Sequence, residues 1–391
     1  MLPPAYYRVV GANGLANVAD GIRSAAFPLL AAGLTGSKTL IALVFAAGQA
    51  PWAVMGLWAG KLVDSMDRRM LVQLVAGCRV LVLSALAMLI AFDATPLWLV
   101  AVAAFVLGTS EVLSDNVSGA VVPMLVPARH LEKANSRLVG VQIIGDELVG
   151  PIIGAWLFAI GAALPFFANA SLLAGAVLLL AGLPLLAPAP TLGPQASQSP
   201  DPTGLLEGLS TIRNQPVLRA ITMASAALAA ADAAWFVLLV VFVRDRLGLG
   251  ATGFGLLLAV GAIGGLGGAL IADRKATWPL RTVSRLVFGS MAASLLILGL
   301  FPTIGVTGAV LAATSGGFAL WNTRAVSARQ RATPNELLGR VGATYRSIVV
   351  SVGLLSALAG GVVADLASIE VTLIIVGVGS AVAGLLLDRS I

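Results

Sequence analysis

Apolar stretches of about 20 residues recur from one end of the chain to the other, separated by short polar or basic breaks. A helix of about 20 apolar residues is long enough to span the hydrocarbon layer of a bilayer. The recurrence therefore predicts a bundle of membrane-spanning helices. We place about twelve spans, near residues 9–33, 39–60, 70–92, 96–120, 137–159, 162–186, 217–243, 252–272, 284–301, 303–325, 341–363 and 369–387.

The composition agrees with this interpretation. Hydrophobic residues make up 58% of the chain and charged residues only 11%, whereas soluble domains are about 25% charged. We therefore predict an all-α integral membrane protein that lies in a lipid bilayer. We expect no removable signal peptide, because the first apolar run is too long for one and continues into a multi-pass pattern.

The basic residues indicate the orientation of the chain. A net charge of +6 would suggest a nucleic-acid partner in a soluble protein, but here the Lys and Arg residues gather in or beside alternate loops, Arg79 included. Only Lys38, Arg244 and Arg246 fall on the opposite side, and Arg23 lies inside a span. By the positive-inside rule, we expect a bacterial inner-membrane protein with both termini in the cytoplasm and no nucleic-acid partner.

The sequence also excludes several kinds of chemistry. Cys78 is the only cysteine and His130 the only histidine, so an internal disulfide and a multi-histidine metal site are both impossible. No G-x-x-x-x-G-K-[ST] phosphate-binding loop occurs, so the chain does not hydrolyse ATP by that motif. We predict a gradient-driven transporter rather than an enzyme, with no cofactor and no metal site.

The chain divides into two similar halves. A stretch rich in Pro, Gly, Ser and Gln is typical of a flexible linker, and we assign residues 187–213 to a cytoplasmic linker between bundles formed by 1–186 and 214–391. Asp20 lies sixteen residues before Gly36, and Asp232 lies sixteen before Gly248. Internal repeats of this kind place a substrate site between the halves, near the middle of the membrane.

Two loops carry a family resemblance. The residues after the second span, and more weakly those after the eighth, resemble the loop signature of the major facilitator superfamily. This resemblance implies twelve transmembrane helices in two six-helix bundles with pseudo-two-fold symmetry, and a gate latch that stabilises the outward-facing state. The alternative is that these residues signal topology alone. The signature comprises Gly60, Leu62, Asp64, Arg68 and Arg69, and its copy spans Gly268 to Arg274, including Asp273.

Further segments are similar to one branch of that family, which holds the enterobactin exporter and macrolide, tetracycline and multidrug efflux proteins of bacteria. They are "VADGIRSAAFPLL", "LVPARHLEKANS", "GPIIGAWL" and "ELLGRV". Gly150, Pro151 and Gly154 resemble a motif of antiporter branches, although Arg137 and Asp146 stand where that motif has glycine. The resemblance implies export. Close helix packing at small residues explains the motif equally well.

Six acidic residues lie within predicted spans, where a carboxylate is costly enough to be a functional candidate. Helical spacing arranges most of them on polar stripes that can face a water-filled cavity. The first stripe is Asn13, Asn17, Asp20, Ser24 and Phe27; the second is Glu111, Ser114, Asp115 and Ser118; the third begins with Gln142 and Asp146; Glu147 and Asp232 lie apart from these.

We expect a proton-coupling set and a substrate-binding set among these residues. Arg23 would hold Asp20 ionised, but the two could also form an ion pair that only neutralises both charges. Glu111 and Asp115 could pair with Arg137 or Arg346 instead of carrying protons. Aromatic rings could bind a cation or anchor the protein in lipid. The first set is Asp20, Glu111, Asp115 and Asp146; the second is Asn13, Asn17, Arg23, Phe27, Gln142, Asp232, Trp235, Phe236, Trp321 and Asn322.

From the resemblance and these residues, we predict a monomeric secondary transporter. It would export an amphipathic, cationic or zwitterionic small molecule in exchange for protons by alternating access. The first half holds five of the six acids, which favours a cationic substrate such as a drug or dye. The alternatives are a siderophore or metabolite exporter, a lipid or lysolipid transporter without strict proton coupling, and a membrane sensor that transports nothing.

Overall fold

The computed structural model describes residues 3–54, 68–127, 130–181 and 202–388, and the secondary structure within these ranges is entirely helical. Ten segments of this described part are long and apolar enough to cross a membrane. With α1 and α2 they make the twelve predicted spans. The helices are α1 (Pro4–Leu34), α2 (Lys38–Val54), α4 (Arg68–Ala91), α5 (Leu97–Leu125), α6 (Leu131–Gln142), η2 (Ile143–Val149), α7 (Gly150–Ile160), α8 (Leu164–Ala181), α9 (Pro202–Asn214), α10 (Pro216–Asp245), α11 (Ala251–Arg274), α12 (Leu280–Leu300), α13 (Ile304–Ala332), η3 (Asn335–Leu337), α14 (Leu338–Leu366) and α15 (Ile369–Leu387).

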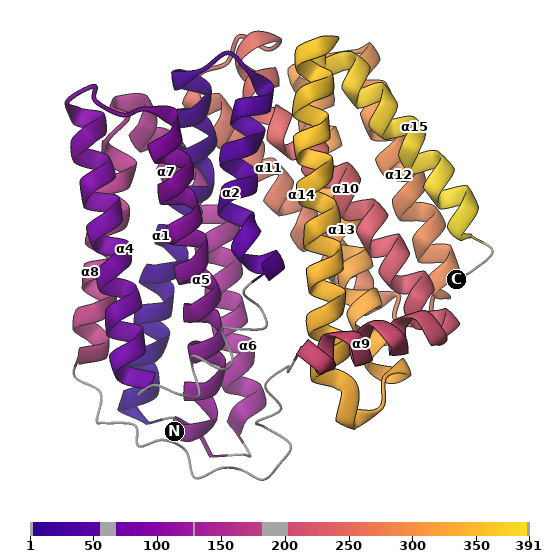
Figure 1. Ribbon diagram of the computed structural model, residues 1–391, viewed down its shortest axis with the longest axis horizontal. Coiled ribbons are helices and arrows are strands. Elements are labelled where there is room, and N and C mark those ends of the chain that lie inside the picture. Colours follow the sequence, from indigo (N-terminus) through magenta and orange to yellow (C-terminus); the bar gives the residue numbers. More distant parts are fainter. Residues whose placement is uncertain (1–2, 55–67, 128–129, 182–201, 389–391) are drawn as a thin grey trace.

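The helices form two bundles that lie side by side (Figure 1). In the first bundle α1 packs against α7 and α8, α2 against α5, and α4 against α5 and α8. In the second, α10 packs against α14 and α15, α11 against α13, and α12 against α13 and α15. The interface between bundles repeats the same relation, because α2 packs on α14 and α11 packs on α7. The predicted pseudo-two-fold symmetry is therefore present in the packing.

The C-terminal part of the predicted cytoplasmic linker, 187–213, is helical and not extended or irregular chain. Residues 202–213 belong to α9, which crosses the lower end of the second bundle in Figure 1. Gly208 packs directly against Thr344 and the Arg340 backbone of α14, and Glu207 forms an ion pair with Arg340. These contacts with α14 hold α9 in place. Residues 187–201 lie outside the described part of the chain.

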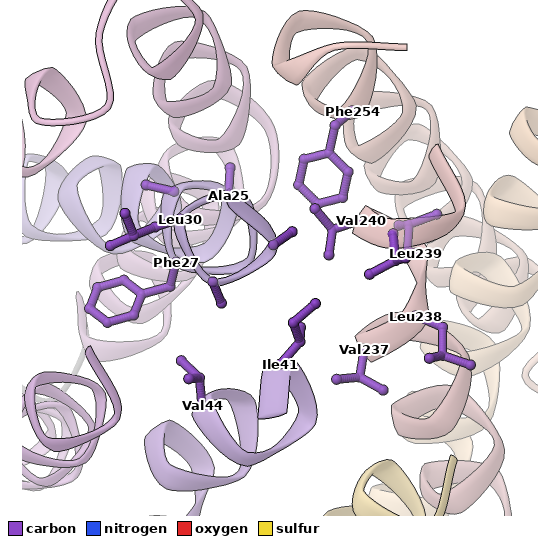
Figure 2. Packing of buried hydrophobic residues seen from close by; sticks show 14 of the residues in the cluster. Ala25, Phe27, Leu30, Ile41, Val44, Val237, Leu238, Leu239, Val240 and Phe254 are labelled. Atoms are coloured by element: carbon purple, nitrogen blue, oxygen red, sulfur yellow. The ribbon is translucent and has the colours of Figure 1, made fainter. Parts of the chain in front are cut away.

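Within the described residues, the apolar core joins the two bundles at one end. One cluster of buried residues extends through both bundles near the turns that follow α1, α4, α7, α10, α12 and α14. Figure 2 shows side chains of α1 and α2 facing those of α10 and α11, Ile41 and Val237 among them. Toward the opposite end, the clusters belong to single bundles: Leu218 and Val341 lie in one, and Leu71 and Val112 in another.

A polar contact closes the joined end across the interface. The carboxylate of Asp365, near the end of α14, accepts hydrogen bonds from the start of α2 and from Ser37, the residue before it. The backbone N–H groups of Lys38 and Thr39 donate at 2.9 Å and the hydroxyls of Ser37 and Thr39 at 2.7 Å. The Lys38 Nζ atom lies 3.6 Å from Asp365 Oδ1. We call this set the α2–α14 latch.

Candidate functional site

A cavity of about 290 Å³ lies where the two bundles meet. Helices α1, α2, α5 and η2 of the first bundle form most of its wall, and α10 of the second bundle forms the rest. One side of the wall is charged and the other is apolar. The lining residues are Asp20, Arg23, Ser24, Phe27, Pro28, Ala31, Ile41, Val44, Phe45, Gly48, Gln49, Ala104, Glu111, Asp146, Phe236 and Val237.

The charged side is backed by a network of ion pairs from three helices of the first bundle, α1, α4 and α5. Arg23 of α1 donates a hydrogen bond from Nη2 to Glu111 of α5, and its Nε lies 3.6 Å from Asp20 Oδ1. Arg79 of α4 donates from Nη2 to the same Asp20 oxygen. The predicted pairing of Asp20 with Arg23 is thus one part of a larger network. Glu111 pairs with Arg23 and not with Arg137 or Arg346.

The position of Arg79 corrects one assignment made from the sequence. We assigned it to a cytoplasmic segment, but it lies well inside α4 and its side chain is only 3% exposed. A buried guanidinium is stable in a membrane when a carboxylate pairs with it, and Asp20 provides that pair. The other basic residues assigned to the cytoplasmic side keep that assignment. The orientation remains a prediction that rests on them.

Asp146 lies in η2, a π-helical segment between α6 and α7. Such segments are rare and occur often at functional sites. Asp146 lines the cavity with Asp20 and Glu111, yet no described residue forms an ion pair or hydrogen bond with its carboxylate. Among the described side chains of this network, three carboxylates therefore share two guanidinium groups, and Asp146 is the carboxylate without a paired arginine.

Tight packing against α1 holds η2 and α7 in position. A Cβ atom at Gly150 would stand 2.6 Å from Gly21 Cα, and one at Gly154 would stand 2.6 Å from the Ile22 carbonyl oxygen. Only glycine permits this approach. The helix-packing interpretation of "GPIIG" therefore has a direct structural basis, and the packing lies beside the charged network.

The apolar side of the cavity includes three phenylalanines. Phe27 packs edge-to-face on Phe166, with ring centroids 5.5 Å apart. Phe45 of α2 and Phe236 of α10 approach each other across the bundle interface, with centroids 6.1 Å apart. The cavity can therefore surround a flat or apolar group with rings while its charged side meets a polar group.

The other predicted substrate-binding residues do not line this cavity. The Asn17 amide donates to the Asn13 carbonyl oxygen at 2.7 Å, one turn earlier in α1. Trp235 packs on Phe242 in the core, and Trp321 is buried and donates to Ser225 at 2.8 Å. Gln142 and Asn322 are exposed. Asp232 lies on α10 one turn before Phe236, with no ion pair to a described residue.

Part of the predicted gate cannot be placed. Gly60 and Asp64 lie outside the described residues. Arg68 and Arg69 begin α4, but their side chains, like that of Asp115 in α5, lie outside the described part. The second copy is described: Asp273 and Arg274 end α11 and are exposed.

Sequence analysis missed Phe45, Gln49 and Arg79 as residues of the site or its network. Phe45 and Gln49 are four residues apart in α2 and so share a helix face, a spacing that could have identified them. Arg79 carried a clear signal too, because it lies nine positions after the start of the predicted span 70–92 and not at its end.

A family model matches most of this chain, and a curated relative matches a shorter part of it. A model of the Major Facilitator Superfamily matches residues 9–357. Macrolide efflux protein A of Streptococcus pyogenes is 24% identical over 158 residues, which are 40% of this chain and 38% of that protein. The match thus spans less than half of the curated relative.

Two solved structures share the fold. A variant of the nucleoside transporter NupG has a TM-score of 0.79 at 13% identity, covering 99% of both chains. A bacterial homologue of the iron transporter ferroportin, in an inward-facing state, has a TM-score of 0.78 at 16% identity, covering 99% of this chain and 98% of that one. At these identities the likeness establishes the fold alone.

Proposed function

Because the chain belongs to the Major Facilitator Superfamily, we propose that it exports an amphipathic cationic or zwitterionic small molecule from the cell in exchange for protons. Transport would proceed by alternating access of the cavity between the bundles. We also propose that the protein is a monomer of a bacterial inner membrane, with both termini in the cytoplasm.

The excess carboxylate in the cavity carries this proposal. Asp20, Glu111 and Asp146 face Arg23 inside the cavity, and Arg79 pairs with Asp20 from behind it. A cluster with one carboxylate more than its guanidinium groups attracts one positive charge in a low-dielectric site. A proton or a cationic substrate can supply that charge. Competition between the two for one site would couple their movements in opposite directions.

The rest of the cavity supports the substrate class. Phe27, Phe45 and Phe236 line it and can pack against an apolar or aromatic body, and aromatic faces also attract cations. Its volume of about 290 Å³ lies at the small end of the range for small-molecule sites, about 300 to 1,000 Å³. The similarity to a macrolide efflux protein supports export of a drug-like compound.

The difference between the two ends of the molecule supports a cavity that opens toward the cytoplasm. The α2–α14 latch and the shared apolar core close the end that, by the positive-inside rule, faces outward. At the other end the buried clusters are separate in each bundle. We infer that this is the inward-facing state, in which the cavity receives substrate from the cytoplasm.

An anionic siderophore is less well supported. That alternative requires free arginines at the cavity, but Arg23 is paired with Glu111. Arg346 is exposed and lies over the Trp52 ring, 5.7 Å from its centroid. Arg23 is therefore neutralised by a carboxylate, and Arg346 does not line the cavity.

The test uses proteoliposomes with an imposed pH gradient and pairs of a cationic dye and its neutral analogue of similar shape. We expect the wild type to accumulate the cation against its gradient, and Asp146→Asn to lose that accumulation. Glu147→Gln is the matched control, because Glu147 is exposed on the same π-helical segment and does not line the cavity. It should still accumulate the cation against its gradient, with at most a small shift in pH dependence, because the Glu147 charge makes the smallest contribution of those that act on Asp146.

Other outcomes would contradict parts of the proposal. Wild-type transport that ignores the pH gradient would exclude proton exchange and favour a lipid or lysolipid substrate. Equal transport of the cationic and neutral analogues would exclude the assigned substrate class. Loss of coupling in Glu147→Gln but not in Asp146→Asn would place the proton site elsewhere.

A further inference from the structure

We propose that Arg79 is a positioning residue that sets the proton affinity of the cavity, by binding Asp20 and so leaving Arg23 to Glu111. This inference rests on the proposed proton-exchange function and extends it to a residue behind the cavity wall. Arg79 itself does not line the cavity. Its effect would therefore reach the bound proton only through Asp20 and Arg23.

The geometry favours this division of partners. Asp20 Oδ1 receives the Arg79 hydrogen bond, while Arg23 Nε stays 3.6 Å away from the same oxygen, beyond hydrogen-bond range. Arg23 instead donates its Nη2 hydrogen bond to Glu111. The Nε groups of both arginines lack a hydrogen-bond partner among the described residues, so each guanidinium is held by its Nη2 end.

Removal of the Arg79 charge would change which carboxylates Arg23 must neutralise. Asp20 would then be a second buried carboxylate without a full partner, and Arg23 would have to serve Asp20 and Glu111 together. The network would hold two carboxylates more than guanidinium groups instead of one. Because each unpaired negative charge favours protonation of its neighbours, the cluster would bind its proton at higher pH.

Among the described residues, few other charged groups can mask this effect. The described groups whose charges act on Asp146 are Asp20, Arg23, Glu111 and its neighbour Glu147. Of the other helices packed on η2, α7 has no titratable residue, Asp273 and Arg274 lie at the exposed end of α11, and Arg137 of α6 is exposed. The side chains of Asp115, Glu132 and Lys133 lie outside the described part.

A cycle of variants tests the proposal. We would compare the wild type with Arg79→Gln, Arg79→Lys and the double variant Asp20→Asn with Arg79→Gln. Arg79→Gln should move the midpoint pH of transport upward by about one unit, the size typical of one added charge in a partly buried cluster. Arg79→Lys keeps the charge and should stay near the wild type. The double variant restores the charge balance and should return the midpoint toward the wild-type value.

A second readout does not depend on transport. Infrared difference spectra of the protein in lipid report the protonated carboxyl groups as the pH is changed, and Asp146→Asn identifies the band of that residue. We expect the midpoint of this band to shift upward in Arg79→Gln and to return in the double variant.

The two readouts separate failure of this inference from failure of the proposed function. If the infrared midpoint shifts and returns while wild-type transport ignores the pH gradient, proton exchange is refuted and the role of Arg79 in proton binding stands. If wild-type transport is proton-coupled but Arg79→Gln leaves both midpoints unchanged, the inference on Arg79 is overturned. An Arg79→Gln shift that the double variant does not reverse also overturns it, because the effect would then not pass through Asp20.

Discussion

At the scale of single residues, glycines determine how closely α7 lies against α1 beside the charged network. A Cβ atom at Gly154 would stand 2.6 Å from the Ile22 carbonyl oxygen and 2.9 Å from its Cα. Both neighbours are backbone atoms of a packed helix, so neither can move aside without shifting α1. Ile22 lies between Asp20 and Arg23, and such a shift would disturb the network directly.

We therefore expect Gly154→Ala to lower the midpoint of thermal unfolding in detergent, by a destabilisation of about 1–3 kcal/mol from overpacking. Gly140→Ala in α6 is the control, because a Cβ there meets no atom within 4 Å. Replacing this helical glycine should stabilise the protein by up to about 1 kcal/mol through helix propensity. If both variants unfold at the same temperature, the close packing of α7 on α1 does not stabilise the fold.

The sequence predicted part of one cavity-facing stripe of α1, since Asp20, Ser24 and Phe27 line the cavity but Asn13 and Asn17 do not. Helical spacing put Asp20 and Phe27 on one stripe, and both line the cavity, because periodicity along one helix depends on local geometry alone. The pairs that complete the site join residues 59 and 88 positions apart, Arg79 with Asp20 and Arg23 with Glu111. Such pairs depend on how separate helices pack, which a single sequence does not specify.

At the scale of elements, the α2–α14 latch ties the start of α2 to the end of α14. Its hydrogen bonds cross the interface between bundles, so they form only while this end is closed. A hydrogen bond to a charged group contributes about 1.5–3 kcal/mol when buried, and less where solvent screens it. The Asp365 side chain is 26% exposed, so we assign the latch a modest energy.

Asp365→Ala should raise the population that is open at this end about fivefold, which corresponds to about 1 kcal/mol. The measurement is the rate at which a membrane-impermeant maleimide, added outside, labels Val44→Cys in a Cys78→Ser background. Val44 lines the cavity and is only 3% exposed while that end is closed.

The control removes a carboxylate that does not cross the interface. Asp388 accepts hydrogen bonds from Arg281 and Arg285 within the second bundle, and these two guanidinium groups hold the pKa of its carboxyl well below the usual range. Asp388→Ala should leave the labelling rate unchanged. Faster labelling in both variants would mean that loss of any surface ion pair loosens the protein, and the latch would have no special role.

Prediction of the helices succeeded where hydrophobicity determines them. It failed where tertiary contacts determine them. The apolar runs located the spans because the bilayer itself requires long apolar helices. The segment that forms α9 has a composition that resembles a linker, and it is helical where Gly208 and Glu207 meet α14. Neither contact can be predicted from the local sequence pattern.

At the scale of the whole molecule, the two bundles behave in the proposal as two bodies that separate at alternate ends. The internal repeat of the sequence predicted their symmetry, and the equivalent packing of α2 on α14 and of α11 on α7 gives the interface two related seams. In transporters built from repeats, one body rocks against the other around a fixed site. Opening at the outer end must then separate α2 from α14.

A disulfide between α2 and α14 should therefore stop transport. An ideal Cβ at Gly361 would lie 2.9 Å from the Ala42 Cβ and 2.8 Å from the Lys38 carbonyl oxygen, so α2 and α14 must separate slightly before Ala42→Cys with Gly361→Cys can form a bond, and the reduced double variant must first be shown to transport. In a Cys78→Ser background, we expect the oxidised protein to lose transport in proteoliposomes and to regain it on reduction.

The matched cross-link lies within one bundle, between Gly299→Cys on α12 and Leu373→Cys on α15, where the corresponding Cβ distance is 3.7 Å. A disulfide within one bundle does not hinder a bundle that moves as a rigid body, so this variant should keep its transport rate when oxidised. Full transport by the Ala42–Gly361 cross-linked protein would show that the bundles need not separate there. Loss of transport in both cross-linked proteins would instead mean that helices within a bundle must also move, which contradicts rocking of rigid bodies.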